Sequence, residues 1–589
     1  MSNQYSPGQT HPTMSNTTTG PHSESPLLTS SNLPPVSETE ARGWYHGLPS
    51  HPKLIARTGS LPFELVPSFD AGFPDHPETK ELRVVGEHKI RDVWEDDLAL
   101  KIHALLDEKQ VDWTSTDVVW IATIDEPKGG NNVVLWIGVV PESLSYERGI
   151  DVALRCQRVL ADDYGIEDVD VEIRTSRVVK AADARPRLCE PVSCCQDNEK
   201  RLGVMETLAY TLGIPICGRD TQGVEGTAGF FLDDKSEGDG GRLLLVTARH
   251  VVLPDLDDDE GFEHKEEREE RKLRDVLVLN DASFKKHVTA VEKAIWLGDT
   301  SIDYSKNCLA SFLNETGEQA EKGRKAAQKE GEQAEKAAEV LTEYHEELLK
   351  HWATEDSRVL GHVIYSPPMD VDSTSGYARD VAVIAVDPDK VDPASFPGNM
   401  IDLGGEYRRI DLMLMMPRNP KNAHPFSYTP FFRELGLRGI VSDEEMRKPV
   451  DYDEDGNPCI AVLMRGATSG LKIGHANSIF SYTRDDKGRV SKQWPILPIP
   501  KAKVRSLHNK YGQRTTFGKV GDSGAVVVDA VGRIGGIVVC GAGDRKWEFD
   551  VTYVTPVGAL LDFVKAGKGL KGVKAREGPD EETLFWKMI

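Results

Sequence analysis

From about residue 200 to about residue 570 the chain consists of short apolar runs separated by glycine-rich turns, and this pattern constrains its fold most. Examples are "RLLLVT" at 242–247 and "AVVVDAVGRIGGIVV" at 525–539. Runs of this length, rich in β-branched residues, form strands rather than helices. A long series of short strands is typical of antiparallel barrels and sandwiches. The sequence therefore predicts a mainly β protein.

Two charged insertions interrupt this pattern. Residues 255–275 are almost wholly polar and belong in solvent. Residues 309–353 have a helical composition, and apolar residues recur there every seven positions, at Ala320, Ala327, Ala334, Leu341 and Leu348. That spacing forms one side of a coiled-coil seam, but the facing positions include Gly323 and Glu330, which pack poorly. A solvated helix or helical hairpin on the barrel is favoured over a dimerisation coil.

The two ends of the chain differ from this region. Residues 1–40 are rich in Ser, Thr and Pro, cannot pack a core, and are expected to be a disordered tail. Residues 80–182 contain apolar runs at 117–125 and 132–140, a helical pattern from 146 and an alternating run at 168–179. They predict a small α/β domain of ββαβ order with a docking or structural role. Residues 567–589 form a C-terminal tail.

Composition excludes several classes of function. The 589 residues carry a net charge of -24, which disfavours nucleic acid or an anionic membrane as a partner. No apolar run approaches the ~20 residues of a membrane span, and the N-terminus lacks the features of a signal peptide. The eight cysteines contain no C-x-x-C pair, which favours free thiols in a reducing compartment. A cytoplasmic protein is expected.

One acidic segment resembles a metal site only in part. "DYDEDGNP" at 451–458 begins like an EF-hand loop, but the position of the bidentate glutamate is Val462 and flanking helices are missing. The segment is predicted to be an acidic hairpin turn, and neither a metal nor another cofactor is expected.

Ser523 lies in "GDSGA" at 521–525 and has two interpretations. Gly, Asp and Ser are common in ordinary turns between strands, whereas a nucleophilic serine needs a histidine base and an orienting carboxylate. The α/β-hydrolases and subtilisins place a helix after the serine, but a β-hairpin around Gly532 follows here. The last histidine of the chain is His508, so the base must precede the serine. The α/β-hydrolases and the subtilisins are therefore both excluded.

A β protein with the order His, Asp, Ser remains. His250 follows the apolar run "LLLV", and Asp380 directly precedes "VAVIAV". A single histidine or aspartate at such a position is more often a structural residue, hydrogen-bonded in the core or at a strand edge, than a catalytic one. Three such residues in this order, each at a strand end, indicate a catalytic triad.

These motifs resemble the chymotrypsin/trypsin-like serine peptidases. "TARH" is similar to their T-A-x-H, "DVAVI" to D-I-A-L-L and "GDSGA" to G-D-S-G-G. The stretch at 464–479 resembles a strand pair of their second barrel, and "YVTPVGALLDFV" resembles their closing strand and helix. The resemblance spans about 205–566 and implies two antiparallel six-stranded β-barrels with the triad in the cleft between them.

The resemblance also implies residue roles. His250 would accept the proton of Ser523 and return it to the leaving group, while Asp380 would hold the imidazole. Backbone N–H groups of Gly521 and Ser523 would form the oxyanion hole.

Two further residues would bind substrate. Phe517 stands where the family sets the base of its specificity pocket, so cleavage after Lys or Arg is not expected. Gly541 would lie on the strand that binds the substrate backbone.

Two positions depart from the family pattern, and a third needs a different partner. Val251 stands where secreted members carry a disulfide cysteine, and Ala525 replaces a glycine. The barrel region follows about 200 residues of chain, so Asp522 needs a partner other than a newly cleaved N-terminus.

Two functions remain open. The first is an active serine endopeptidase acting on a protein or peptide substrate. The second is a catalytically inactive interaction or scaffold protein of the same fold, which would bind a protein partner through the N-terminal α/β domain or the helical insertion.

Overall fold

A computed structural model describes most of the chain between residues 36 and 578. The described range omits 67–75, 124–132, 181–203, 205–207, 209–210, 235–241, 265–272, 313–315, 392–395, 397, 404–406, 408, 418, 427–433, 454, 500–515 and 544–547. Most of the predicted N-terminal tail, part of the charged insertion at 255–275 and the end of the C-terminal tail therefore lie outside the described residues. The last residues assigned to the N-terminal tail belong instead to the helix α1 (Glu38–Gly43).

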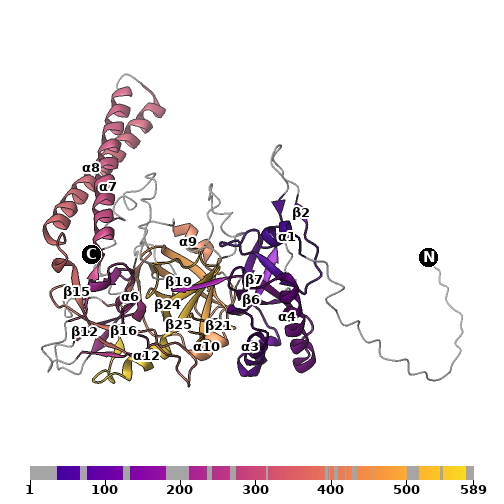
Figure 1. Ribbon diagram of the computed structural model, residues 1–589. Helices are drawn as coiled ribbons and strands as arrows, with labels where there is room; N and C mark the ends of the chain where they lie inside the picture. Colours follow the sequence, from indigo (N-terminus) through magenta and orange to yellow (C-terminus); the bar gives the residue numbers. More distant parts are fainter. Residues whose placement is uncertain are drawn as a thin grey trace, which may run out of the picture.

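A closed barrel occupies the centre of the molecule (Figure 1). Its six strands are β19 (Ile460–Gly466), β20 (Gly470–Ala476), β22 (Val490–Pro498), β25 (Val551–Pro556), β24 (Ile534–Gly543) and β23 (Val526–Asp529). Each pairs antiparallel with the next, and β23 returns to β19 to close the ring. The stretch at 464–479 and the terminal strand–helix pair (β25 with α12, Val557–Lys565) take the forms expected from the sequence.

The second sheet lies beside this barrel and is curled but open. Its nine strands are β9 (Pro215–Gly218), β10 (Gly226–Thr227), β11 (Phe230–Asp234), β12 (Arg242–Thr247), β13 (Phe262–Glu263), β14 (Asp275–Val278), β15 (Val359–Ser366), β16 (Ala382–Val386) and β26 (Lys574–Ala575).

The prediction of two closed six-stranded barrels is therefore confirmed for one barrel only. The strand that would complete the other ring is split into β10 and β11 at Ala228 and Gly229. Ala228 donates its N–H to Ile214, next to β9, and Gly229 donates its N–H to Val246 of β12, so the chain changes neighbour between these two residues. β26 then pairs with the free edge of β11, so this part of the predicted C-terminal tail belongs to the sheet.

The N-terminal region forms an α/β unit that shares its sheet with the barrel. Its strands are β1 (Leu54–Arg57), β4 (Lys80–Arg83), β5 (Trp113–Thr123), β6 (Val133–Val139) and β7 (Asp170–Thr175). The helix α4 (Tyr146–Arg158) connects the parallel strands β6 and β7, and β5 pairs with β21 (Ser481–Arg484), which leads into the barrel. The strands β5, β6 and β7 and the helix α4 follow the sequence pattern. The strands β1 and β4 and the helical run α2 (Ile90–Val93), η1 (Trp94–Leu98) and α3 (Ala99–Glu108) had no counterpart in it.

Buried polar contacts join this unit to the barrel. Tyr553 of β25 donates its hydroxyl to Asp117 of β5 at 2.9 Å, and Trp94 donates its indole N–H to the Phe480 carbonyl at 2.9 Å. The unit is therefore fused to the barrel rather than tethered by a linker.

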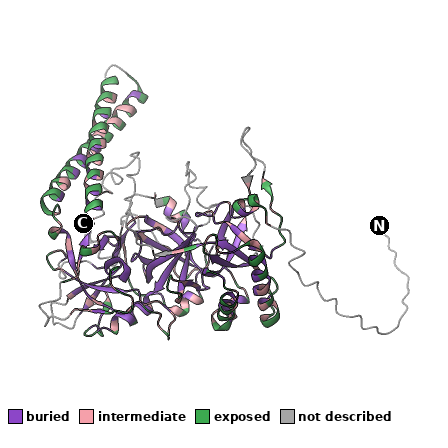
Figure 2. Ribbon diagram, in the orientation of Figure 1, coloured by how far each residue is buried: buried purple, intermediate pink, exposed green. Residues whose placement is uncertain are grey.

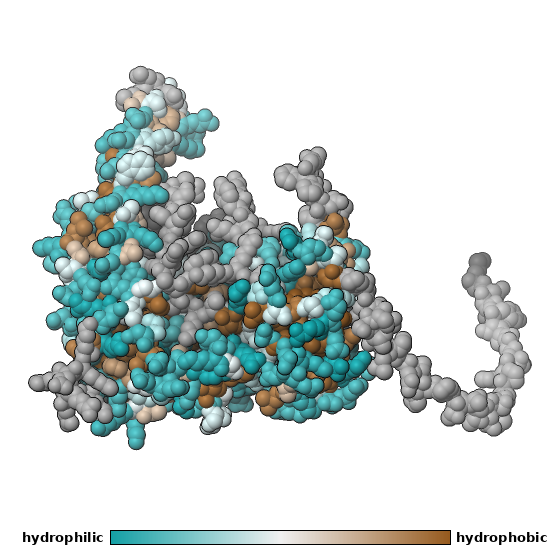
Figure 3. All heavy atoms as spheres, in the orientation of Figure 1, coloured by the Kyte–Doolittle hydropathy of each residue, from teal (hydrophilic) through white to brown (hydrophobic). Residues whose placement is uncertain are grey.

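A long helical hairpin projects from the open sheet (Figure 1). It consists of α7 (Asp281–Ser311) and α8 (Glu318–His351), and its surface is largely exposed (Figure 2) and hydrophilic (Figure 3). Of the heptad residues, Ala320, Ala334, Leu341 and Leu348 are buried. α8 packs on α7 of the same chain: a Cβ added to Gly298 of α7 would lie 3.9 Å from the carbonyl oxygen of Ala334 and 3.4 Å from Ala338 Cβ. The sequence pattern revealed α8 but not α7, because α7 has no regular heptad.

Among the described helices, none has the length and apolar character needed to cross a membrane.

Candidate active site

The three residues of the predicted triad lie together. Nδ1 of His250 is 2.5 Å from a carboxylate oxygen of Asp380, and its Nε2 is 2.7 Å from Ser523 Oγ. The second carboxylate oxygen of Asp380 accepts the backbone N–H of His250 at 3.1 Å. A carboxylate at Nδ1 favours the tautomer with its proton there, which leaves the Nε2 lone pair facing the serine hydroxyl.

Strand pairing produces this arrangement. His250 is in the single-turn helix α6 (Arg249–Val252), which follows β12, and Asp380 stands just before β16. β12 and β16 are antiparallel neighbours with Thr247 opposite Ala382, so the end of one strand lies beside the start of the other. Ser523 comes from the turn before β23 of the closed barrel.

Arg249 fixes the histidine side of the site, although no sequence motif pointed to it. Its guanidinium is buried and donates to the carbonyl oxygens of Pro367 at 2.6 Å, Asp257 at 2.8 Å and Glu260 at 2.8 Å. A rigid fork of donors matches such a set of carbonyls, which a lysine would satisfy only in part. Because Arg249 directly precedes His250, these bonds hold the start of α6 in place.

Asp522 fixes the serine side. Its buried carboxylate accepts the backbone N–H groups of Lys519 at 2.8 Å, Ser469 at 3.0 Å and Thr468 at 3.1 Å. Burial raises the pKa of Asp522, and these hydrogen bonds oppose that shift. The Asp522 carboxylate thus links the turn that holds Ser523 to the turn between β19 and β20. Its hydrogen-bond donors are backbone N–H groups of the chain and not an N-terminus.

Glycine is required on both sides of Ser523. Gly521 has φ +99° and Gly524 has φ +90°, in the region that side chains disfavour. A Cβ at Gly521 would also overlap the hydroxyl of Thr468, and one at Gly524 would overlap the Thr227 carbonyl. The conformation of the turn around Ser523 therefore depends on the absence of a side chain at Gly521 and Gly524.

The two predicted substrate-binding residues are each covered by a neighbour. Phe517 is buried and packs on β20, since a Cβ at Gly474 would lie 2.6 Å from its ring. Gly541 lies on β24 under the ring of Phe549, which a Cβ at Gly541 would overlap. No sequence motif indicated Phe549, because only the pairing of β24 with β25 brings that residue beside Gly541.

The edge of β24 at Gly541 is also paired. The short strand β8 (Arg177–Lys180) runs antiparallel to residues 540–543, with Val179 opposite Gly541. Ser523 itself is fully buried, and its Oγ lies 3.2 Å from the Val539 carbonyl as well as near His250.

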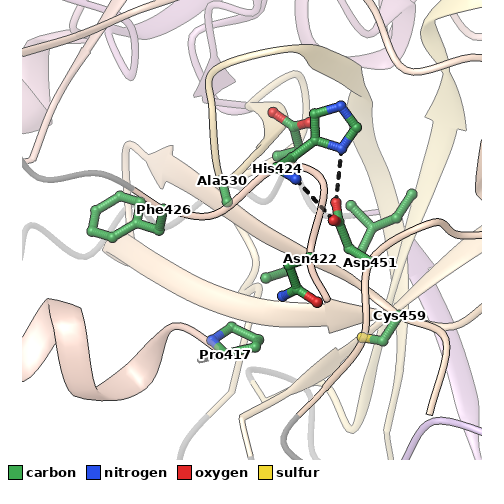
Figure 4. A pocket seen from close by; sticks show the side chains of 10 residues that line it. Pro417, Asn422, His424, Phe426, Asp451, Cys459 and Ala530 are labelled. Carbon is green, nitrogen blue, oxygen red and sulfur yellow. Dashed lines mark hydrogen bonds and ion pairs between the residues drawn. The ribbon is translucent and has the colours of Figure 1, made fainter. Parts of the chain in front are cut away.

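A second cluster of titratable side chains includes His424 and Asp451, which Figure 4 shows beside a small pocket. His424, Glu445 and Asp451 bring ligand-type atoms within 4.8 Å of one another, and His424 Nδ1 is 2.9 Å from the Asp451 carboxylate. Arg533 donates to Glu445 at 2.6 Å and lies 3.3 Å from His424 Nδ1, so a guanidinium already supplies the positive charge. The adjoining cavity of about 10 Å³ holds about one water molecule. This cluster fits an ion-pair network and not a substrate or metal site.

The acidic segment at 451–458 is a turn, as predicted. The carboxylate of Asp453 accepts the N–H groups of Asp455 at 2.9 Å and Asn457 at 2.8 Å, within its own loop.

Comparison with known proteins adds little. No protein-family model matches the chain, and no curated protein matches it. It is similar to a solved structure described as "A glutamic acid specific serine protease utilizes a novel histidine triad in substrate binding", at 11% identity and a TM-score of 0.26. The similarity covers 62% of this chain and 99% of that chain. Similarity this distant carries no argument about function, which rests on the residues of the chain itself.

Proposed function

We propose that the protein is a serine endopeptidase that hydrolyses peptide bonds with Ser523 as nucleophile, His250 as general base and Asp380 as its orienting carboxylate. The observation that carries this proposal is the unbroken hydrogen-bonded chain from Asp380 through His250 to Ser523, with links of 2.5 and 2.7 Å. An ordinary turn serine needs neither of the other two side chains.

The reaction follows from these contacts. His250 Nε2 takes the Ser523 proton as Oγ attacks the scissile carbonyl, and then delivers that proton to the leaving amine. The Asp380 carboxylate stabilises the imidazolium formed between these two steps. Water, activated by the same nitrogen, then hydrolyses the acyl-enzyme.

The turn around Ser523 supports the proposal energetically. The N–H groups of Gly521 and Ser523 would stabilise the developing oxyanion, at ~3–4 kcal/mol for a donor of this kind. Because Asp522 is already satisfied by Lys519, Ser469 and Thr468, the turn needs no newly formed N-terminus to hold its shape. The peptidase is therefore proposed to form its catalytic turn without zymogen-type cleavage.

Aromatic residues near the expected pocket suggest apolar specificity. Phe517 and Phe549 offer no carboxylate to a basic side chain, and burying an unpaired Lys or Arg charge costs several kcal/mol. We expect cleavage after small or medium apolar residues in a peptide library with every amino acid at the cleaved position. Efficient cleavage after Arg would contradict the assignment of Phe517.

A second candidate is an inactive interaction protein of the same architecture. The burial of Ser523 and the occupied edge of β24 favour it, because both restrict access to the nucleophile.

Fluorophosphonate labelling of the full chain distinguishes the two functions. Only an activated serine reacts, so the wild type should gain one adduct at Ser523, located by mass spectrometry, while Ser523→Ala gains none. His250→Ala is the matched variant: it keeps the serine but should lose labelling. Equal labelling of all three proteins, or none of a folded wild type, would favour the interaction protein.

A further inference from the structure

The edge of β24 next to the triad is occupied by another part of the chain. Gly541, Ala542 and Gly543 are paired with Val179, Val178 and Arg177, and Cys540 is paired with Lys180. The opposite edge of β24 is paired with β25 over residues 540–542. Along these three residues, both edges of β24 therefore carry a neighbouring strand.

The direction of β8 brings its C-terminal end towards the nucleophile. Moving from Arg177 to Lys180, the partner on β24 shifts from Gly543 to Cys540. Cys540 follows Val539, whose carbonyl oxygen is 3.2 Å from Ser523 Oγ. The next part of the same edge is bonded to the Ser523 turn, since Gly524 N–H donates to Val538 O at 2.8 Å. β8 and the Ser523 turn thus share one edge of β24, end to end.

An extended substrate would need the same place and the same direction. A peptide that adds to β24 uses the main-chain groups of its edge, and its acyl side must run towards Ser523. β8 satisfies both conditions. The two strands exclude each other, because a strand edge binds one partner at a time.

The N-terminal unit holds β8 there. β8 follows β7 after the single buried residue Ser176, whose N–H donates to Val139 O at 2.8 Å. A second segment of the unit binds the chain just before β25, the other neighbour of β24: Ser50 N–H donates to the buried Asp550 carboxylate at 2.7 Å. Such tethering gives a short strand an effective concentration in the millimolar range.

We propose that β8 is a built-in occupant of the substrate-binding edge, so that the peptidase is latent while β8 is paired with β24. The inference rests on the proposed function and assigns its regulation. Arg177 is exposed and Val178 is half-buried against the core, so release of this end of β8 breaks backbone hydrogen bonds and uncovers one partly buried side chain. The N-terminal α/β unit then acts as the support that keeps β8 in place.

Breaking the ladder tests the proposal. Val178→Pro with Val179→Pro removes ladder N–H groups, whereas Val178→Thr with Val179→Thr keeps them and the β-branched shape. The proline variant should raise kcat/KM on a fluorogenic peptide library by at least about tenfold, which equals ~1.4 kcal/mol of relieved competition. The threonine variant should stay near the wild type, and labelling of Ser523 by a small fluorophosphonate shows that the triad works in each.

A disulfide that holds β8 on β24 gives the opposite test. It does not depend on a variant that breaks the pairing of these strands. Lys180→Cys introduces a cysteine at the position opposite the native Cys540, and Arg177→Cys, opposite Gly543, is the matched control. After oxidation, mass spectrometry verifies the disulfide between the introduced thiol and Cys540. Peptide hydrolysis should then fall at least about tenfold and recover on reduction. The control should not respond.

The outcomes separate this inference from the proposed function. If no variant labels with fluorophosphonate or cleaves peptides, the peptidase proposal fails. If all label, but neither the proline pair nor the verified disulfide changes peptide hydrolysis, the peptidase stands and the latency proposal is wrong.

Discussion

The two halves of the candidate site are held by buried charges of opposite sign. On the barrel side, the Asp522 carboxylate accepts three backbone N–H groups around the Ser523 turn. On the open-sheet side, the Arg249 guanidinium donates to three backbone carbonyls next to His250. Buried backbone groups must be paired, and one ion can pair several of them at once. Each half is thereby fixed to the main chain, so contacts within the chain set the geometry of the candidate site.

The barrel side should be the more sensitive half. Asp522→Ala leaves three N–H groups without their acceptor, one of them buried and two part-buried, and we expect a loss of about 3–5 kcal/mol in unfolding free energy together with loss of Ser523 labelling. Urea denaturation and fluorophosphonate labelling measure the two effects. Asp529→Ala is the control, because this buried carboxylate accepts the N–H groups of Val531 and Arg533 in the same barrel, in the turn at the other end of β23. It should lose stability and keep labelling.

A glycine in the same turn allows the backbone itself to be tested. Gly521→Ala forces a side chain into φ +99° and against Thr468, so we expect kcat to fall by about 10²–10³ as the oxyanion donor is displaced. Gly532→Ala introduces a comparable strain at φ +87°, in the hairpin after β23. That variant should lower the thermal midpoint and leave kcat within about threefold of the wild type. Equal kcat in the two variants would show that the Gly521 N–H has no catalytic part.

The open-sheet side should respond to loss of the guanidinium. Arg249→Met keeps much of the side-chain volume but leaves carbonyl oxygens unpaired, and we expect about 2–3 kcal/mol of destabilisation. If Arg249 positions His250, kcat should fall while KM stays constant, and Arg249→Lys should restore part of kcat. If the variant loses stability but keeps the kcat of the wild type, Arg249 has a structural role and does not position His250.

A pH experiment extends the comparison to a less well satisfied carboxylate in the open sheet. Burial raises the pKa of Glu225 to about 7, although it accepts Asn280 N–H and the Ser283 hydroxyl at 2.9 Å each. Because the folded state holds this proton to higher pH than the unfolded state does, stability should fall as pH rises from about 4.5 through 7. The loss should be about 2 kcal/mol between pH ~5.5 and ~7.5.

Glu225→Gln cannot titrate, so its unfolding free energy should change less over the same pH interval. Parallel urea titrations of the two proteins at each pH measure the difference. Identical pH dependence would mean that Glu225 is already ionised at the acid end of the interval.

Much of the site could be predicted from the sequence because its elements are local. The order His250, Asp380, Ser523 and the strand run beside each residue are visible in single short segments. The glycines around Ser523 indicate a turn for the same reason, since positive φ depends on one residue. The prediction of a second barrel was confirmed only as a curled, open sheet, because closure depends on how the strand is divided at Ala228 and Gly229 between its two neighbours.

By itself, the sequence determined the β character of the chain, the acidic helical insertion, the acidic turn at 451–458 and which residues could form a triad, since strand periodicity and turn chemistry act between near neighbours. Only the tertiary structure showed that Arg249 and Asp522 hold the backbone beside His250 and Ser523. It also showed that Phe549 covers Gly541 and that β8 pairs with β24. Those features need surfaces that meet only after the chain has folded. A four-residue strand such as "RVVK" can pair with any open edge, and the fold selects which edge it meets.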